Sequence, residues 1–413
     1  MNRPSLTRLR AWRPGAYLRS SAGLFPWLLL RMLGQVVLVV LLARLLGAAG
    51  YGRFIVVLAV ATFFAPLAGL GLQGVLLRDG SRHPDVIPNQ LAEALWLWSW
   101  AVLCFSAIGF TVALLVLPHL PPAPAVAALV FGEVAGSSLV ELLARIEQAL
   151  DRIGHYGATM AGLVLARVAA LGLYAVFYKP GVTGWMWAYA GASLLYAAAR
   201  LVATWRRVRP HGRTRASPLF RQSIPFALGS LSLRLQHEFN KPVLAEVGYG
   251  IAGNFSLAQR GVDVAILPLT AFQEALWPRL YATSDGGRRM RFMGGFLFAL
   301  ALVGGGLLFG AAPFVPRLLG QGFGPAARLL RFLAALPALQ VLRNFGNFRA
   351  VSIHRTDIVA WAYLVGALAS VTLTLWLIPA YGWEGAVGAL YLTEMSVIAV
   401  HVAFRLRPRR GER

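Results

Sequence analysis

One face of the apolar stretch 222–247 carries a row of ionisable side chains. The row consists of Arg234, His237, Glu238 and Lys241. In an α-helix the spacing i, i+3, i+4 and i+7 forms a single stripe about two turns long. Charged groups inside a bilayer are costly and usually face the interior of a helix bundle or a hydrated space. We therefore expect this stripe to face another helix or a polar chamber.

Other apolar stretches contain residues of the same kind. Arg260 and Asp263 lie in the stretch 252–277, and Arg31 and Gln35 lie one turn apart in the stretch 24–46. A further set in the stretch 125–147 consists of Glu133, Ser137, Glu141 and Arg145. Cations in these stretches outnumber the acids nearby, and arginine offers forked donors to phosphate oxygens. A chamber lined by these residues would suit an anionic group.

Internal salt bridges between helices are the alternative interpretation of the same residues. Arg234 and Glu238 form an i,i+4 pair that could neutralise itself. Proline adds a second feature, because Pro242 follows Lys241 directly and can break its helix. A charge beside a helix break is typical of transporter binding sites.

The composition indicates a membrane protein. Hydrophobic residues make up 58% of the 413 positions and charged residues only 13%, about half the charged fraction of a soluble domain. We predict an all-α, polytopic protein with about twelve transmembrane helices in two six-helix lobes around a central cavity. The predicted spans are 24–46, 54–77, 91–117, 125–147, 156–177, 184–205, 222–247, 252–277, 292–311, 326–348, 357–378 and 384–404. The N-terminal lobe is residues 1–205, the basic linker is 206–221, and the C-terminal lobe is 222–413.

The distribution of basic residues predicts the orientation. Of 39 lysines and arginines, 26 fall in the tails and connections on one side, whereas Arg53, Lys179 and Arg317 are the three on the other. The positive-inside rule therefore places both termini in the cytoplasm. The same rule accounts for the net charge of +23, so we do not expect nucleic acid binding. The single cysteine and the absence of a Cys/His cluster predict neither a disulfide nor a metal site.

The two predicted lobes share weak internal similarity at an offset of 201 residues. The matching pairs are Gln35/Gln236, Gly52/Gly253, Phe54/Phe255, Arg78/Arg279 and the pattern Gly181-x-x-Gly184 with Gly382-x-x-Gly385. Each pair falls at the same place in its half. Six helices per half predict parallel repeats related by an axis along the membrane normal.

Several segments resemble polysaccharide biosynthesis flippases of the Wzx type. The segments are Ala43–Gly47 with Gly50–Phe54, Gly253–Arg260, Trp277–Leu280 and Tyr381–Ala386. The resemblance implies membership of the multidrug/oligosaccharidyl-lipid/polysaccharide exporter superfamily. It also implies translocation of undecaprenyl-pyrophosphate-linked oligosaccharide units from the cytoplasmic to the periplasmic leaflet of the bacterial inner membrane by alternating access, for O-antigen, capsule or exopolysaccharide assembly. Expected partners are the lipid-linked substrate, the bilayer, and a polysaccharide polymerase with its chain-length machinery.

The residues and the resemblance together define the expected site. The expected substrate-binding residues are Arg31, Gln35, Arg44, Arg234, Lys241 and Arg260. The candidates for H⁺ or Na⁺ coupling are Glu238, Asp263 and Glu394. Arg44 and Glu394 enter through the resemblance, and Arg44 lies near the outer end of its span on a different face from Arg31. The family often has an acid where this chain has Asn240, which argues against a cation site on that helix. No cofactor and no catalytic residue is expected.

Two other functions fit parts of the pattern. A cation-coupled multidrug exporter would share the architecture but would favour acids and aromatic residues in the cavity. A membrane-integral glycan polymerase or ligase would need a reaction surface outside the membrane, yet the predicted outer loops are short and contain no acid–base pair or nucleophile arrangement.

Overall fold

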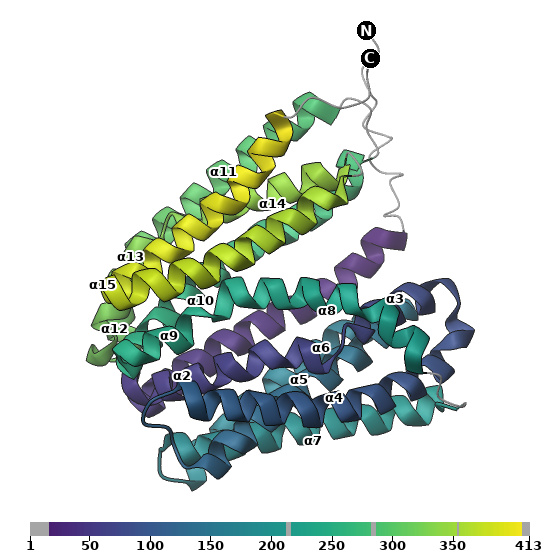
Figure 1. Ribbon diagram of the computed structural model, residues 1–413, viewed down its shortest axis with the longest axis horizontal. Helices are drawn as coiled ribbons and strands as arrows, with labels where there is room; N and C mark the ends of the chain where they lie inside the picture. Colours follow the sequence, from purple (N-terminus) through teal and green to yellow (C-terminus); the bar gives the residue numbers. More distant parts are fainter. Residues whose placement is uncertain (1–15, 212–215, 282–285, 353–354, 407–413) are drawn as a thin grey trace, which may run out of the picture.

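In a computed structural model the chain is almost entirely helical. The structure describes residues 16–211, 216–281, 286–352 and 355–406, and this part contains no β-strand. Its α-helices are α2 (Ala16–Ala68), α3 (Leu72–Arg82), α4 (Ile87–Val116), α5 (Ala123–Ala149), α6 (Ile153–Phe177), α7 (Val182–Val208), α8 (Ala216–Glu238), α9 (Asn240–Val247), α10 (Tyr249–Tyr281), α11 (Gly286–Ala311), α12 (Val315–Leu319), α13 (Gly324–Leu333), α14 (Leu336–Ser352) and α15 (Thr356–Leu406) (Figure 1).

Six helices in the described residues are long and apolar enough to cross a membrane. Two of them, Leu24–Ala68 and Asp357–Phe404, contain 45 and 48 residues. Because about 20 helical residues span the hydrocarbon layer, each suffices for two crossings. Non-helical backbone at Gly47 and Gly382 divides them where the sequence predicts outer turns. With the bent pair α13–α14, and with α7, α8–α9 and α10, they account for all twelve predicted spans, so the all-helical, polytopic fold is confirmed.

The second predicted span differs from the structure at its inner end. It was expected to run to residue 77, but α2 ends at Ala68 and α3 continues to Arg82. Gly71 lies between them with φ 70°, and a Cβ atom there would stand 2.3 Å from the carbonyl oxygen of Ser223 in α8. The close approach of the α8 backbone therefore accounts for the break.

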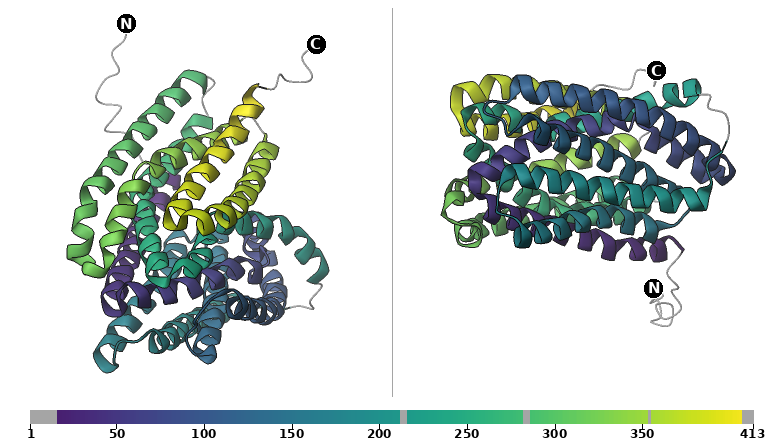
Figure 2. Two further views of the ribbon diagram at one scale, coloured as in Figure 1. Left: turned by 60° about the vertical axis from the view of Figure 1, so that its left-hand side comes forward. Right: turned by 90° about the horizontal axis from the view of Figure 1, so that it is seen from below.

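The helices form two groups that diverge toward one end. Helices α2–α8 make one group and α11, α13, α14 and α15 make the other (Figures 1 and 2). The groups meet near α9 and α12 and diverge toward the end where α2 begins and α15 finishes. The buried apolar residues follow the same division: one core at the meeting end contains residues of both groups, whereas the divergent end has two separate cores. The predicted lobe boundaries at 205 and 222 stay a prediction, and α8 packs against helices of both groups.

A backbone contact joins the two halves at their meeting end. A Cβ atom on Gly52 would stand 1.8 Å from the Tyr249 carbonyl oxygen, and one on Gly253 would stand 3.0 Å from Gly52 Cα. These glycines are a matching pair of the 201-residue repeat. Gly47 and Gly248, at the same offset, both have positive φ, 67° and 150°. The equivalent positions of the repeat therefore meet where α2 crosses α10.

Alanine at Gly52 tests this contact. The new methyl group has no space, so Gly52→Ala should destabilise the purified protein by roughly 1–3 kcal/mol, as overpacking typically does. Gly172→Ala is the matched control, because nothing lies within 4 Å of a Cβ atom there. Thermal unfolding in detergent measures both. Equal melting temperatures for the two variants would contradict the contact.

Candidate functional site

The charged stripe predicted on 222–247 crosses a helix break. Helix α8 ends at Glu238, Phe239 forms a turn, and α9 begins at Asn240. Pro242 is the third residue of α9 and has no N–H to continue the α8 hydrogen-bond ladder. The break therefore stands where the Lys241-Pro242 pair predicts it.

Lys241 and Glu238 form an ion pair across the break. Their side chains are 4% and 13% exposed, so the pair is nearly dry. Arg260 and Asp263 on α10 are close enough for their charges to act on Lys241. These four side chains sum to zero formal charge. Lys241 is therefore not a free cation, and its partner is Glu238 rather than a ligand.

Arg31 and Arg234 are two cations of the predicted set that lack a close acidic partner among the described residues, although Glu141 acts electrostatically on Arg31 and Arg234 acts on Glu238. Both side chains are exposed, and within the described residues neither has an ion pair or hydrogen bond. Helix α2 packs against α8, and the charge of Arg31 interacts with those of Arg234, Arg167 and Glu141, which belong to three other helices. The Arg31 guanidinium therefore lies within electrostatic range of charged groups on three other helices of the bundle. Gln35 lies one turn along α2 and is partly buried.

The two arginines also lie at similar depth. Arg31 precedes the turn glycine Gly47 by 16 residues, and Arg234 precedes Gly248 by 14. At 1.5 Å per helical residue these separations correspond to about 24 and about 21 Å from the outer turns. Two positive charges on packed helices thus lie at a similar distance from the outer turns and within range of each other's charge.

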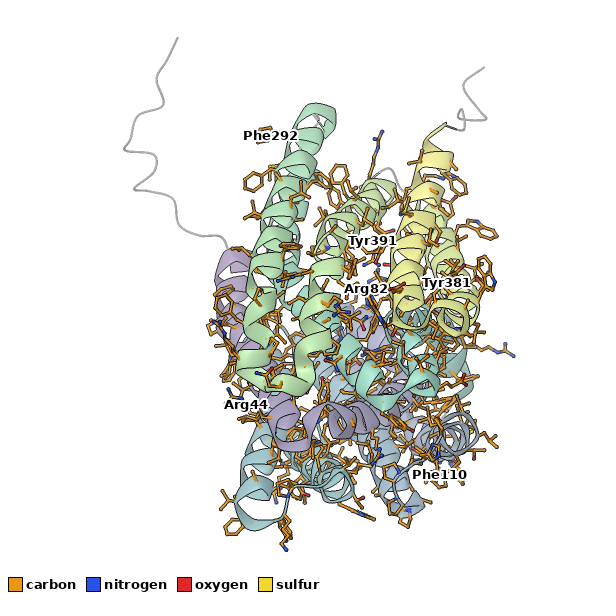
Figure 3. All side chains as sticks on the ribbon, turned by 90° about the vertical axis from the view of Figure 1, so that its left-hand side faces the viewer. Arg44, Arg82, Phe110, Phe292, Tyr381 and Tyr391 are labelled. Carbon is orange, nitrogen blue, oxygen red and sulfur yellow. The ribbon has the colours of Figure 1, made fainter. Side chains whose placement is uncertain are left out.

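Arg44 lies apart from this site. Its Nε donates a hydrogen bond to the backbone carbonyl of Leu318 in α12, and Figure 3 shows it near the edge of the molecule. In this conformation Arg44 ties α12 to the outer end of α2.

Two buried arginine–glutamate pairs fit the alternative interpretation of internal salt bridges. Arg167 bonds Glu133 at 2.7 Å and also donates to Ser137 and Ser193. Arg343 on α14 bonds Glu394 on α15 at 2.8 Å. The side chains of both pairs are at most 10% exposed. Glu394, expected as a coupling residue, therefore has an arginine partner that sequence reasoning did not assign.

Two amide side chains beside the break were also missed. Gln259 donates a hydrogen bond of 3.0 Å to the carbonyl of His237 in the last turn of α8, and its Oε1 atom has no partner among the described residues. Asn240 is 3% exposed, and its Oδ1 and Nδ2 atoms likewise lack partners in that part of the chain. Their positions next to Arg260 and Lys241 were the available signal. No group of three or more metal-ligating side chains occurs in the described residues.

Comparison with known proteins identifies the family. The family profile described as polysaccharide biosynthesis protein matches residues 23–283, more than half of the chain. The chain belongs to this family. No functionally curated protein matches its sequence.

Solved structures of transporters share the fold of this polysaccharide biosynthesis protein. The lipid II flippase MurJ in an inward closed conformation is 12% identical, with a TM-score of 0.70 over 95% of this chain and 88% of that one. A multidrug resistance MATE transporter of the MOP superfamily is 14% identical in its inward-facing conformation, with a TM-score of 0.69 over 91% and 94%. An outward-facing MATE structure is 15% identical, with a TM-score of 0.57 over 93% and 94%. The fold is thus that of MOP-superfamily transporters and flippases.

Neutralising an arginine that is paired with a glutamate should destabilise the protein far more than neutralising one without an acidic partner. Arg167→Met leaves Glu133 buried without its cation, which should destabilise the protein by about 3–5 kcal/mol. The double variant Arg167→Met/Glu133→Gln should recover most of that loss. Arg234→Gln removes no bond and should change stability by less than about 0.5 kcal/mol. Thermal unfolding of the four proteins, wild type included, measures this. A large loss in Arg234→Gln would show that its charge is structural.

Proposed function

We propose that this protein is a flippase that moves undecaprenyl-pyrophosphate-linked oligosaccharide units from the cytoplasmic to the periplasmic leaflet for surface polysaccharide assembly. Its membership of the polysaccharide biosynthesis family and the fold it shares with a lipid II flippase support this proposal. The observation that carries it is that Arg31 and Arg234, on the packed helices α2 and α8, form no ion pair or hydrogen bond within the described residues while their charges act on each other.

The pair suits a pyrophosphate. Two guanidinium groups on facing helices supply forked N–H donors to phosphate oxygens, and their charges repel one another until an anion joins them. Gln35, one turn away, adds neutral donors and acceptors for sugar hydroxyls. Arg260 contributes at the edge of the site, because its Nε atom has no partner among the described residues. The lipid tail would remain in the bilayer between the diverging halves.

Closure at the outer end supports an inward-facing resting state. Arg53 stacks on the Tyr249 ring, with 5.8 Å between Cζ and the ring centroid. The Tyr249 hydroxyl donates to the carbonyl of Pro118, and the Gly52–Gly253 contact lies at the same end. The higher TM-score with the inward-facing than with the outward-facing MATE structure agrees with this arrangement. Substrate would enter from the cytoplasmic side, where the halves diverge.

Membrane potential would contribute to the direction of transport. Moving negative charge away from a negative cytoplasm gains about 2.3 kcal/mol per charge per 100 mV. A pyrophosphate carries at least one full negative charge across, so the potential favours outward release. Asp263, an exposed acid close to Arg260, remains the candidate for H⁺ coupling.

A multidrug exporter is the second candidate, and the MATE-like fold favours it. The uncompensated charge at the site is positive, however, which disfavours cationic drugs. Drug susceptibility of cells with and without the protein separates the two functions. We regard an enzyme as the least favoured reading, since its family and fold are those of transporters.

Neutralising the arginine pair tests the proposal. Because a hydrogen bond to a charged group contributes about 1.5–3 kcal/mol, Arg31→Gln or Arg234→Gln should weaken binding of a polyprenyl pyrophosphate to the purified protein by roughly 10- to 100-fold. Cells that carry the double variant, at the membrane abundance of the wild-type protein, should produce no surface glycan. Lys179→Gln, at an exposed outer position, is the control. If the double variant binds the polyprenyl pyrophosphate as tightly as wild type and supports the same amount of surface glycan, the proposed anion site is refuted.

Reporter fusions test the proposed orientation in the inner membrane. A fluorescent protein fused after Arg413 should fold and fluoresce, because the C-terminus is expected in the cytoplasm. A phosphatase inserted after Lys179 should be active, because that turn is expected in the periplasm. The opposite pattern would invert the orientation inferred from the basic residues.

A further inference from the structure

Four exposed arginines form a patch, here called the arginine patch, at the end of the molecule where the two halves meet. Arg44 belongs to α2, Arg317 to α12, and Arg328 and Arg331 to α13. All four side chains are exposed, and in the part of the chain that the structure describes none of them forms an ion pair. The chain has no aspartate or glutamate between residues 286 and 356. The segment that carries three of these arginines therefore has no acid of its own to neutralise them.

The helices that carry the arginine patch pack against one another. The Nε atom of Arg44, at the edge of the molecule (Figure 3), donates a hydrogen bond to the carbonyl of Leu318, the residue after Arg317. Helix α12 contacts both α2 and α13. Arg328 and Arg331 stand at i and i+3, so they lie on one face of α13. Because α2 belongs to one group of helices and α13 to the other, the patch crosses the seam between the two halves.

Helix α13 has one buried and one exposed face. The buried face lies in the core that both halves share and consists of Ala326, Leu329, Leu330 and Leu333. Arg328 and Arg331, on the exposed face, follow the first helical residue, Gly324, by four and seven positions. These separations correspond to about 6 and about 10 Å along the helix. Long cationic side chains near the end of a membrane helix extend to the interface, so both guanidinium groups can reach the level of the lipid head groups.

Exposed apolar side chains adjoin the arginine patch. They are Phe309, Phe314, Leu318 and Phe332, each more than half exposed. The Cζ atom of Arg331 lies 5.6 Å from the centroid of the Phe309 ring, and the Cζ atom of Arg317 lies 5.7 Å from that of the Phe314 ring. Positive groups beside exposed apolar side chains match a ligand with a negative head and an apolar tail.

The rule that places most cations on the cytoplasmic side does not account for the arginine patch. Only three of the 39 lysines and arginines fall in the predicted outer connections, and Arg317 is one of them. Arginine offers forked donors to phosphate oxygens, and basic pockets between transmembrane helices bind lipid head groups. We propose that the arginine patch binds the phosphate of an anionic phospholipid, whose acyl chains lie along the exposed apolar side chains.

Arg44 makes the bound lipid a link between the two halves. Its Nε atom is bonded to the Leu318 carbonyl, but its two Nη groups have no hydrogen bond within the described residues and can donate to a phosphate. A phosphate shared by Arg44 and the arginines of α12 and α13 adds a contact between the halves at their closed end. An anionic lipid should thus stabilise this conformation. Lipid binding here does not depend on whether the transported substrate is a lipid-linked glycan.

Thermal unfolding of the purified full-length protein in detergent tests the proposal. Short-chain phosphatidylglycerol should raise the melting temperature of wild type saturably by about 2–5 °C. Phosphatidylcholine of the same chain length and inorganic phosphate should not, because the first has no net charge and the second has no acyl chain. An equal shift with phosphatidylcholine or with inorganic phosphate would overturn the assignment to an anionic phospholipid.

Removing the positive charges of α12 and α13 locates the site. Arg317→Gln/Arg328→Gln/Arg331→Gln should lose most of the shift that phosphatidylglycerol produces in wild type. A triple variant with the full shift would show that the lipid binds elsewhere, which contradicts the proposal.

Two further variants complete the comparison. Arg82→Gln/Arg152→Gln/Arg206→Gln removes the same charge from exposed positions at the divergent end, so it should keep the shift. Arg44→Gln alone should weaken the apparent affinity for phosphatidylglycerol roughly 10-fold, because one charged hydrogen-bond donor is lost. Unchanged affinity in Arg44→Gln would exclude the link between the halves.

Wild-type protein provides a second test if the α12–α13 variant does not fold. A photoreactive phosphatidylglycerol, reconstituted with wild type in nanodiscs, should label the segment 309–332. Excess phosphatidylglycerol should suppress this labelling more than excess phosphatidylcholine does. Labelling confined to other segments, or equal suppression by the two lipids, would overturn the proposal.

Discussion

A charge inside the hydrocarbon layer must be paired, hydrated or bound to a ligand, and the structure of this protein follows from that constraint. Two arginines, Arg167 and Arg343, are paired with glutamates inside their own halves. Lys241 is paired across a helix break. Among the described residues Arg31 and Arg234 have no such partner, and they lie on the packed helices α2 and α8. The presence or absence of a close acidic partner thus separates arginines that hold helices together from those that the proposed function assigns to an anion.

The same constraint explains which features of the fold and the site could be predicted from the sequence. Helix number and the division at Gly47 and Gly382 follow from apolar length and from glycines that accept positive φ. The break beside Lys241-Pro242 follows from the missing amide of proline. Pairing, in contrast, depends on rotation and tilt between helices distant in sequence. Glu238 could meet either Arg234 or Lys241, both at helical spacing, and in the structure it pairs with Lys241.

Ion pairs between different helices could not be predicted from the spacing of residues along the sequence, for a related reason. The Arg343–Glu394 bond joins residues 51 positions apart, and periodicity along one helix carries no information on which helix lies opposite. The internal repeat was more informative, because equivalent residues of a repeat meet at its symmetry axis. Gly52 and Gly253 were matched by offset alone, and they prove to be in contact.

That contact has a mechanical consequence. Two glycines place bare main chain against main chain, so the halves can tilt about this point without interlocked side chains having to change rotamers. Parting the two halves at this end would also uncover part of the apolar core that both groups share there, so the glycine contact removes a rotamer cost of tilting but not the cost of exposing that core. Bulkier residues at these two positions would interlock the halves, and, under the alternating-access mechanism proposed above, the rate of tilting would fall.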